Sequence, residues 1–257
     1  MSDLAGPRIR AVPAVTRAIA ILRLLSRSRA PLSLKAIAQS LELVPSTTLH
    51  ILRALMAEQL VRVELTKRYS LGVGMLPLAR AVLENGDFPN LVRPRLDDLS
   101  RRYPITAIGV ELPDLDHMIV VALARSQAPV RLHVDVGSRF PALISATGRC
   151  LAAFTEQPWP EIEKRFHRLR WHNAPDYESW RKEVDVTRRQ KYSIDRGNYI
   201  SGVTIVAVPV LNGRGTISHT LAAVGLGNQL DRTTSLKLAQ DMKDVAQELT
   251  TQLLPQA

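Results

Sequence analysis

The sequence predicts an α+β protein in two parts, a small helical N-terminal part that ends in a β-hairpin and a larger C-terminal part built on an antiparallel sheet. One observation is periodicity. Apolar residues recur at helical spacing up to about residue 58, whereas β-rich runs alternate with helical segments from Ile105 onward. The other is charge: residues 1–72 hold eleven Lys and Arg against four Asp and Glu, and residues 73–257 hold 23 against 20. This imbalance indicates a polyanionic partner for the first part. The alternative is that the chain is simply one of many mildly basic soluble proteins.

Composition restricts the class of protein further. A chain of 257 residues with 46% hydrophobic and 23% charged residues is typical of two ordinary globular domains. There is no apolar run of about 18 residues, so we expect no transmembrane helix. The start, MSDLAGPRIRAVP, lacks the apolar core of a signal peptide, and Cys150 is the single cysteine. Both features favour the reducing cytoplasm and exclude an internal disulfide framework.

Three helices and a hairpin are expected in the first part. An apolar stripe predicts a helix over about Val15–Ser28, and Ser33 is a good N-cap for a second helix. Pro45 suits the first position of a third helix, which extends to about Glu58. The alternating run after it predicts a short hairpin with a basic tip, Lys67-Arg68.

The third helix has a polar face. While Leu49, Leu52 and Leu55 form its apolar stripe, the other side carries hydroxyl, imidazole and guanidinium groups. An ordinary solvated face is one explanation. However, two helices joined by a tight turn and followed by a two-stranded ribbon form a winged helix-turn-helix, whose second motif helix enters the DNA major groove.

The polar face is therefore expected to contact DNA. Hydroxyls at the helix N-terminus suit a phosphate, and Arg53 can pair bidentately with a guanine. The basic hairpin tip would contact the neighbouring backbone, and a loose N-terminal arm would add phosphate or minor-groove contacts. The candidate DNA-binding residues are Ser46, Thr47, His50, Arg53, Lys67, Arg68, Arg8 and Arg10.

The C-terminal part is expected to begin after a linker helix. We expect a DNA-binding domain over 1–72, a linker helix over 73–86 and a second domain over 87–257. The linker helix has three open roles: bridging the domains, pairing with a second copy, or packing on its own domain. Helices are predicted at about 74–85, 88–103, 160–169, 177–190 and 234–254. Strands are predicted at 106–112, 117–124 and 130–137, with a hairpin over 202–226 around Asn212-Gly213. This order is typical of a ligand-sensing α+β layer rather than a doubly wound enzyme core.

The chain resembles the IclR family of bacterial transcription regulators over nearly its full length. In the first part the resemblance depends on AIAILRLL, LSLKAIAQSLELVPSTTLHILRALMAEQLV and RYSLG. In the second it depends on GSRFPALISATGRCLAAF and KYSIDRGNYISGVTIVAVPVLNGRG. The resemblance implies a winged helix-turn-helix, a linker helix and a GAF-like effector-binding domain. It also implies a homodimer or homotetramer that represses or activates operons for uptake or breakdown of a small organic acid.

The resemblance also implies an effector pocket. Its positions are, in this sequence, Ser145, Ala146, Thr147, Gly148, Asp195, Ile205, Ala222 and Val224. N–H groups at the start of the SATGRCLAAF helix would suit a carboxylate.

Two departures from the family pattern bear on the effector. Small-acid sensors of the family typically place cysteine and serine at the three strand positions, where this chain has only apolar residues. The acidic pair that often follows the aspartate is here Gly197-Asn198. A pocket that lacks hydroxyls tolerates apolar surface, so an aromatic or otherwise bulky carboxylate is favoured over a two-carbon acid. The alternative is that Ala222 and Val224 are sheet core only.

Other chemistry has little support. No glycine-rich nucleotide loop is present, and His167 and His172 lack the spacing of a zinc helix, so we expect neither cofactor nor metal. Cys150 lies in an apolar helix start and suits packing. No base is recognisable for a Ser145 nucleophile. We therefore expect a ligand-responsive DNA-binding regulator and no enzyme. The alternative is an enzyme or metabolite-binding protein with an accessory winged helix.

Overall fold

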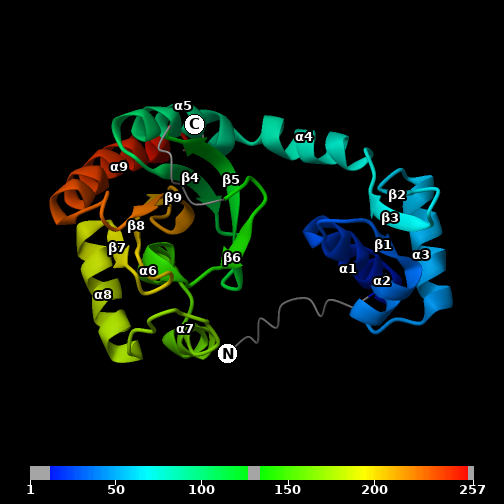
Figure 1. Ribbon diagram of the computed structural model, residues 1–257. Helices are drawn as coiled ribbons and strands as arrows, with labels where there is room; N and C mark the ends of the chain where they lie inside the picture. Colours follow the sequence, from blue (N-terminus) through cyan, green and yellow to red (C-terminus); the bar gives the residue numbers. More distant parts are fainter. Residues whose placement is uncertain (1–11, 127–133, 254–257) are drawn as a thin grey trace, which may run out of the picture. The chain divides into compact units, whose positions relative to one another are not determined.

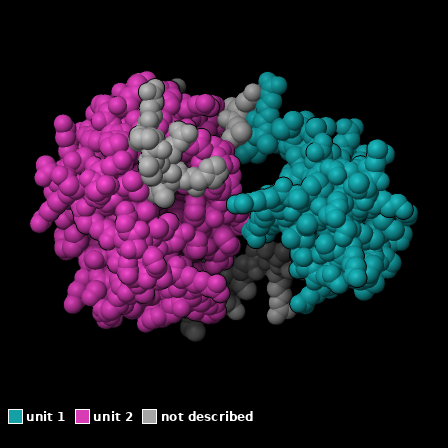
Figure 2. All heavy atoms as spheres, viewed as in Figure 1, with its two compact units in different colours: residues 1–82 teal, residues 83–257 magenta. Residues whose placement is uncertain are grey.

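The computed structural model describes residues 12–126 and 134–253. The chain divides into two compact units, residues 1–82 and 83–257, which Figure 2 colours separately. The division falls within helix α4 (Met75–Asn85). Arg8 and Arg10 lie outside the described residues.

The first unit contains three helices and a small antiparallel sheet of strand order β1-β3-β2. Its elements are α1 (Pro13–Arg27), β1 (Leu32–Ser33), α2 (Leu34–Ser40), α3 (Pro45–Ala57), β2 (Val61–Val63) and β3 (Arg68–Leu71). The predicted helix starts are present: the Ser33 side chain accepts a hydrogen bond from the Ala36 N–H at 3.2 Å, and Pro45 is the first residue of α3. The winged helix-turn-helix is thus confirmed. Strand β1 was not predicted, because two residues carry no periodicity.

The wing packs closely on the end of α3. A Cβ atom at Gly72 would lie 2.0 Å from the Gln59 carbonyl oxygen, so only glycine fits there. The core beneath is one cluster of seven buried hydrophobic residues, to which α1, α2, α3 and the sheet all contribute.

The second unit is a six-stranded antiparallel sheet of order β6-β5-β4-β9-β8-β7 with helices on both faces (Figure 1). Its strands are β4 (Thr106–Glu111), β5 (His117–Arg125), β6 (Arg139–Pro141), β7 (Ser193–Arg196), β8 (Val203–Leu211) and β9 (Ile217–Leu226). Its helices are α5 (Asp87–Arg102), α6 (Ser145–Phe154), α7 (Trp159–Phe166), α8 (Tyr177–Gln190) and α9 (Arg232–Gln252).

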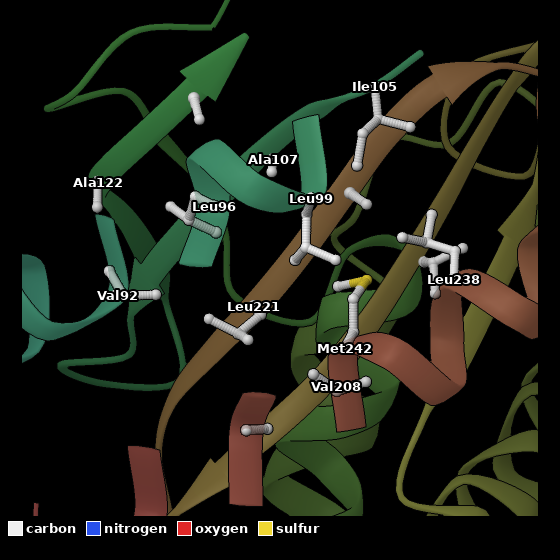
Figure 3. Packing of buried hydrophobic residues seen from close by; sticks show 14 of the residues in the cluster. Val92, Leu96, Leu99, Ile105, Ala107, Ala122, Val208, Leu221, Leu238 and Met242 are labelled. Atoms are coloured by element: carbon white, nitrogen blue, oxygen red, sulfur yellow. The ribbon is translucent and has the colours of Figure 1, made fainter. Parts of the chain in front are cut away.

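Helices α5 and α9 cover one face of this sheet. Val92, Leu96 and Leu99 of α5 pack with Leu238 and Met242 of α9 over strand residues, in the cluster that Figure 3 shows. Helix α6 lies on the other face, with α7 and α8 outside it, and a second and a third cluster fill those layers. The expected α+β effector-type domain is confirmed.

One predicted strand is wrong in its described part. Val134–Gly137 has no strand pairing, and residues 130–133 lie outside the described residues. The Val134 carbonyl instead accepts a hydrogen bond from the Arg125 guanidinium at 2.6 Å, and Gly137 turns the chain with a φ of +87°. The next strand is β6, which pairs with β5 at an edge of the sheet. Strand β7, at the other edge, was also not predicted.

The length and polarity of the helices bear on membrane insertion. Among the described residues, no helix is long and apolar enough to cross a membrane.

Candidate nucleic-acid interface and effector pocket

Helix α3 presents the predicted polar face to the outside of its unit. Ser46, His50 and Arg53 are exposed, and Thr47 is half-buried. Leu52 and Leu55 are buried on the opposite side, together with Thr48, whose hydroxyl donates to the Val44 carbonyl at 3.1 Å. The helix begins without a side-chain cap and has no acidic residue in its first turn. Its free N–H groups and hydroxyls therefore lie at one end of a face that carries Arg53 further along.

The wing adds exposed cations to this unit. Lys67 occupies the tight turn between β2 and β3, with a φ of +57°, and its N–H donates to the Glu64 carbonyl at 2.9 Å. The Arg68 guanidinium donates to the Pro31 carbonyl at 3.2 Å, which holds the wing against the segment before α2. Arg62, which is not among the predicted DNA-binding residues, is exposed and donates to the Ser70 hydroxyl at 2.9 Å. Alternation in this strand would have identified Arg62 as outward-facing.

The second unit contains a cavity of about 120 Å³ between the sheet and the start of α6. The pairing register of the strands determines which side chains form the floor of this cavity. Ile108 of β4 pairs with Ala222 of β9, and Ile205 of β8 pairs with Val224, so these side chains share the face toward α6. Nine of the twelve lining residues that the structure describes are apolar: Ile108, Met118, Val134, Phe140, Ile144, Ile200, Ile205, Ala222 and Val224.

Three polar side chains complete the described lining: Ser145, Thr147 and Tyr199. Ser145 has a φ of +61° and is 2% exposed, and its hydroxyl has no hydrogen-bond partner within the described structure. The helix it opens has Ile144 as its N-cap and so lacks a side-chain cap. The cavity thus meets an unpaired hydroxyl and the uncapped N–H groups of a helix, which favour an anion.

The predicted effector residues divide into two sets. Ser145, Thr147, Ile205, Ala222 and Val224 line the cavity together. The other three are outside the described lining: Ala146, Gly148 and Asp195. Ala146 is core, and a Cβ atom at Gly148 would lie 2.0 Å from the Leu143 backbone, so this glycine permits close packing of α6.

Asp195 is 1% exposed and already paired. Its carboxylate accepts hydrogen bonds from the Asn198 N–H at 2.8 Å and the Tyr199 N–H at 3.3 Å. Because β7 pairs with β8, Asp195 lies opposite Ile205 on the cavity side of the sheet. In this structure it therefore shapes the loop that carries Tyr199.

Several lining residues were missed from sequence. Ile108 and Met118 lie in predicted strands, but both strands are almost continuously apolar, so the sequence does not show which of their residues face the cavity. Phe140 and Val134 carry no local signal, because Phe140 lies in the three-residue edge strand β6 and Val134 lies outside any helix or strand. Burial raises the pKa of Tyr199 at the cavity wall.

The described lining offers no acid–base pair. It contains no His, Asp, Glu, Lys or Cys side chain, so Ser145 has no base beside it. Cys150 is fully buried with its thiol directed at the Ala207 carbonyl, and burial raises the thiol pKa well above its usual range. Among the described residues, His, Cys, Asp and Glu form no cluster of three that could hold a metal ion.

Known proteins resemble this chain in both units. The family model for the C-terminal part of the bacterial transcriptional regulator IclR matches residues 80–251, and the IclR helix-turn-helix model matches residues 14–64. A probable transcriptional regulator SauR from Cupriavidus necator is 28% identical over 236 residues, which cover 90% of this chain and 92% of that protein. The transcriptional repressor AllR of Salmonella typhimurium is 24% identical over 244 residues, covering 93% and 89%.

Solved structures agree in fold. An IclR regulator from Alicyclobacillus acidocaldarius superposes with a TM-score of 0.83 at 25% identity, over 94% of this chain and 99% of that one. An IclR homologue from Microbacterium hydrocarbonoxydans, complexed with 4-hydroxybenzoate, has a TM-score of 0.76 at 18% identity, over 93% and 98%. The chain belongs to the IclR family of bacterial transcriptional regulators.

Proposed function

We propose that this protein regulates a catabolic or transport operon in response to an organic carboxylate with an apolar, aromatic-sized body. The observation that carries the proposal is the apolar cavity against the uncapped start of α6. A carboxylate there would accept hydrogen bonds from the N–H groups of Ala146 and Thr147 and from the Ser145 hydroxyl. The floor of Ile205, Ala222 and Val224 offers no hydrogen bond, so polar groups on the body would be costly.

Cavity size supports an aromatic body. The cavity volume of about 120 Å³ is close to the roughly 150 Å³ of an engineered apolar cavity that binds benzene. The homologue complexed with 4-hydroxybenzoate shares the fold and motivates the choice of test ligands.

The DNA side of the proposal assigns α3 to the major groove. Arg53 would pair with a guanine, His50 would contact a base edge or phosphate, and Ser46 and Thr47 would hold a phosphate at the helix start. Lys67 and Arg68 would contact the adjacent backbone. Arg8 and Arg10 are proposed to contact phosphates or the minor groove.

We also propose a symmetric assembly acting in the cytoplasm. One recognition helix contacts only a few base pairs, so a dimer or tetramer on a palindromic or repeated site would raise specificity. Light scattering at micromolar concentration, with and without DNA, tests this; a monomer under both conditions would contradict it.

A binding assay tests the function directly. Duplexes from the regions flanking the gene are titrated by fluorescence anisotropy, first without ligand and then with acids from glyoxylate to benzoate and 4-hydroxybenzoate. We expect one duplex to bind far more tightly than a scrambled one, and the aromatic acids to change that affinity. Calorimetry of the same acids gives their affinity for the protein alone. Tight binding of only the smallest acids would reject the apolar-pocket assignment, and conversion of any acid would favour an enzyme.

A further inference from the structure

The loop of residues 197–202, between β7 and β8, forms one wall of the cavity. It places Tyr199 and Ile200 against the cavity interior. Glycine stands at both ends, Gly197 with a φ of +85° and Gly202 with a φ of +77°. Glycine adopts these angles without strain, so the loop turns sharply at each end.

The segment between α7 and α8 fastens this loop from the solvent side. The Asn173 side chain donates to the Gly197 carbonyl at 2.7 Å, and the Asn173 N–H donates to the Asn198 carbonyl at 2.9 Å. The Asn198 amide donates in return to the Asn173 carbonyl at 3.2 Å. His172 adds two bonds, one to the Tyr199 carbonyl at 3.2 Å and one from the Ser201 N–H at 3.0 Å. Water competes for most of these exposed groups, so each bond contributes modestly.

A buried cation fastens the loop from the inside. Arg149 of α6 is 1% exposed, and its Nη2 donates to the Asn198 side-chain oxygen at 3.1 Å. Its Nε lies 2.5 Å from the Glu183 carboxylate of α8, and its Nη1 has no hydrogen-bond partner in the described structure. Loss of a partner would leave part of this buried charge uncompensated, which costs free energy. The Arg149–Asn198 bond therefore connects the loop to the helix whose first turn lines the cavity.

Three separate elements converge on Asn198. From α6, Arg149 donates to the Asn198 side chain, and from β7 the Asp195 carboxylate accepts from the Asn198 N–H. From the segment between α7 and α8, Asn173 forms two hydrogen bonds with Asn198, one as donor and one as acceptor. We propose that Asn198 is a positioning residue for the ligand, which holds Tyr199 and Ile200 against the cavity and sets how fast the loop opens to admit and release it. This inference rests on the proposed function, because it takes the cavity as the ligand site.

The test compares three asparagine variants of the full chain. Asn198→Ala removes the two side-chain bonds of Asn198, to Arg149 and to the Asn173 carbonyl, and leaves its backbone bonds in place. Asn173→Ala removes one side-chain bond to Gly197 on the solvent side. The matched control is Asn212→Ala, whose side chain accepts from the Arg214 and Thr216 N–H groups in the β8–β9 turn and does not line the cavity.

The first measurement is amide hydrogen exchange without ligand. We expect Asn198→Ala to speed exchange at the Tyr199 and Ser201 N–H groups about tenfold, as loss of a hydrogen bond to a charged group implies. Asn173→Ala should have a smaller effect, and Asn212→Ala should leave both groups unchanged. Unchanged exchange in Asn198→Ala, or an equal increase in the control, would overturn the proposal.

The second measurement is stopped-flow binding of benzoate. Asn198→Ala should raise the association and dissociation rates together, with a smaller change in Kd, whereas a loss of fold would lower affinity and association alike. Faster exchange with unchanged binding rates would also overturn the proposal. If benzoate fails to bind the parent, the ligand class of the proposed function fails, and the exchange comparison still decides whether Asn198 holds the loop.

Discussion

The units of residues 1–82 and 83–257 differ in charge and in what they leave exposed. Ten of the thirteen exposed large hydrophobic side chains of the described structure belong to the first unit, including Leu65, Val73 and Leu76. Most of the net charge lies there as well. The second unit is nearly neutral and buries its apolar residues in three clusters around one sheet. A smaller unit buries a smaller fraction of its surface than a larger one does.

The contrast separates two kinds of candidate site. In the first unit the proposed DNA contacts are outward-facing side chains on one helix and one hairpin. In the second, the proposed side-chain contacts to the ligand are buried residues that line a cavity. Variants should therefore affect one activity without the other, and the following tests would sharpen or break that separation.

The largest expected effect is on stability. Leu52→Ala empties a fully buried position in the small core of the first unit and should cost about 3 kcal/mol of its unfolding free energy. We expect DNA binding to be lost while benzoate binding remains. Leu99 is equally buried in the second unit, so Leu99→Ala should abolish benzoate binding while DNA binding remains. Thermal unfolding followed by circular dichroism checks this; one shared transition that both variants shift equally would show that the units are not independent.

A pH effect is expected in the second unit. The His219 ring of β9 stacks on the Phe88 ring, with 3.9 Å between the ring centroids. Burial lowers the pKa of His219 to about 4. In the unfolded chain the imidazole binds a proton near pH 6.5, whereas in the folded chain it does so only near pH 4. The free energy of unfolding should therefore be highest above pH 6.5 and fall by about 2–3 kcal/mol as the pH is lowered from 6.5 through 4. Urea unfolding at pH 7.5 and 4.5 should show a smaller pH dependence in His219→Phe than in the parent. The exposed His117→Phe is the control, and an equal change there would contradict the assignment.

On the DNA side, Arg53→Ala should weaken specific binding by about 1–3 kcal/mol if Arg53 contacts a guanine. Lys67→Ala should instead weaken all duplexes alike and reduce the salt slope by about one unit. Anisotropy titrations on operator and scrambled duplexes, at several salt concentrations, distinguish the two. Parent-like operator affinity in Arg53→Ala would remove this residue from base recognition.

The smallest expected effect is in the cavity floor. Replacing either Ala222 or Val224 by serine should weaken the binding of an aromatic acid by about 1 kcal/mol, because the new hydroxyl is desolvated without a hydrogen-bond partner. DNA affinity without ligand should stay at the parent value. Calorimetry with benzoate measures the first and anisotropy the second. No change in benzoate affinity would mean that these residues are sheet core only.

Local chemistry in the sequence determined the elements that depend on near neighbours. Pro45 starts α3, Ser33 caps α2, and the Asn212 turn joins β8 to β9, because each signal acts within a few residues. The polar face of α3 followed from the same reasoning, since helical periodicity alone decides which side chains share a face.

Tertiary structure alone decided the pocket. The cavity floor exists because Ile108 pairs with Ala222 and Ile205 with Val224, across strands far apart in the chain. Edge strands β6 and β7 carry too few residues for a periodic signal. The sequence pointed to Asp195, but only the fold showed its carboxylate holding the Asn198 loop. Burial and cross-strand register are properties of the assembled sheet, and no local segment encodes them.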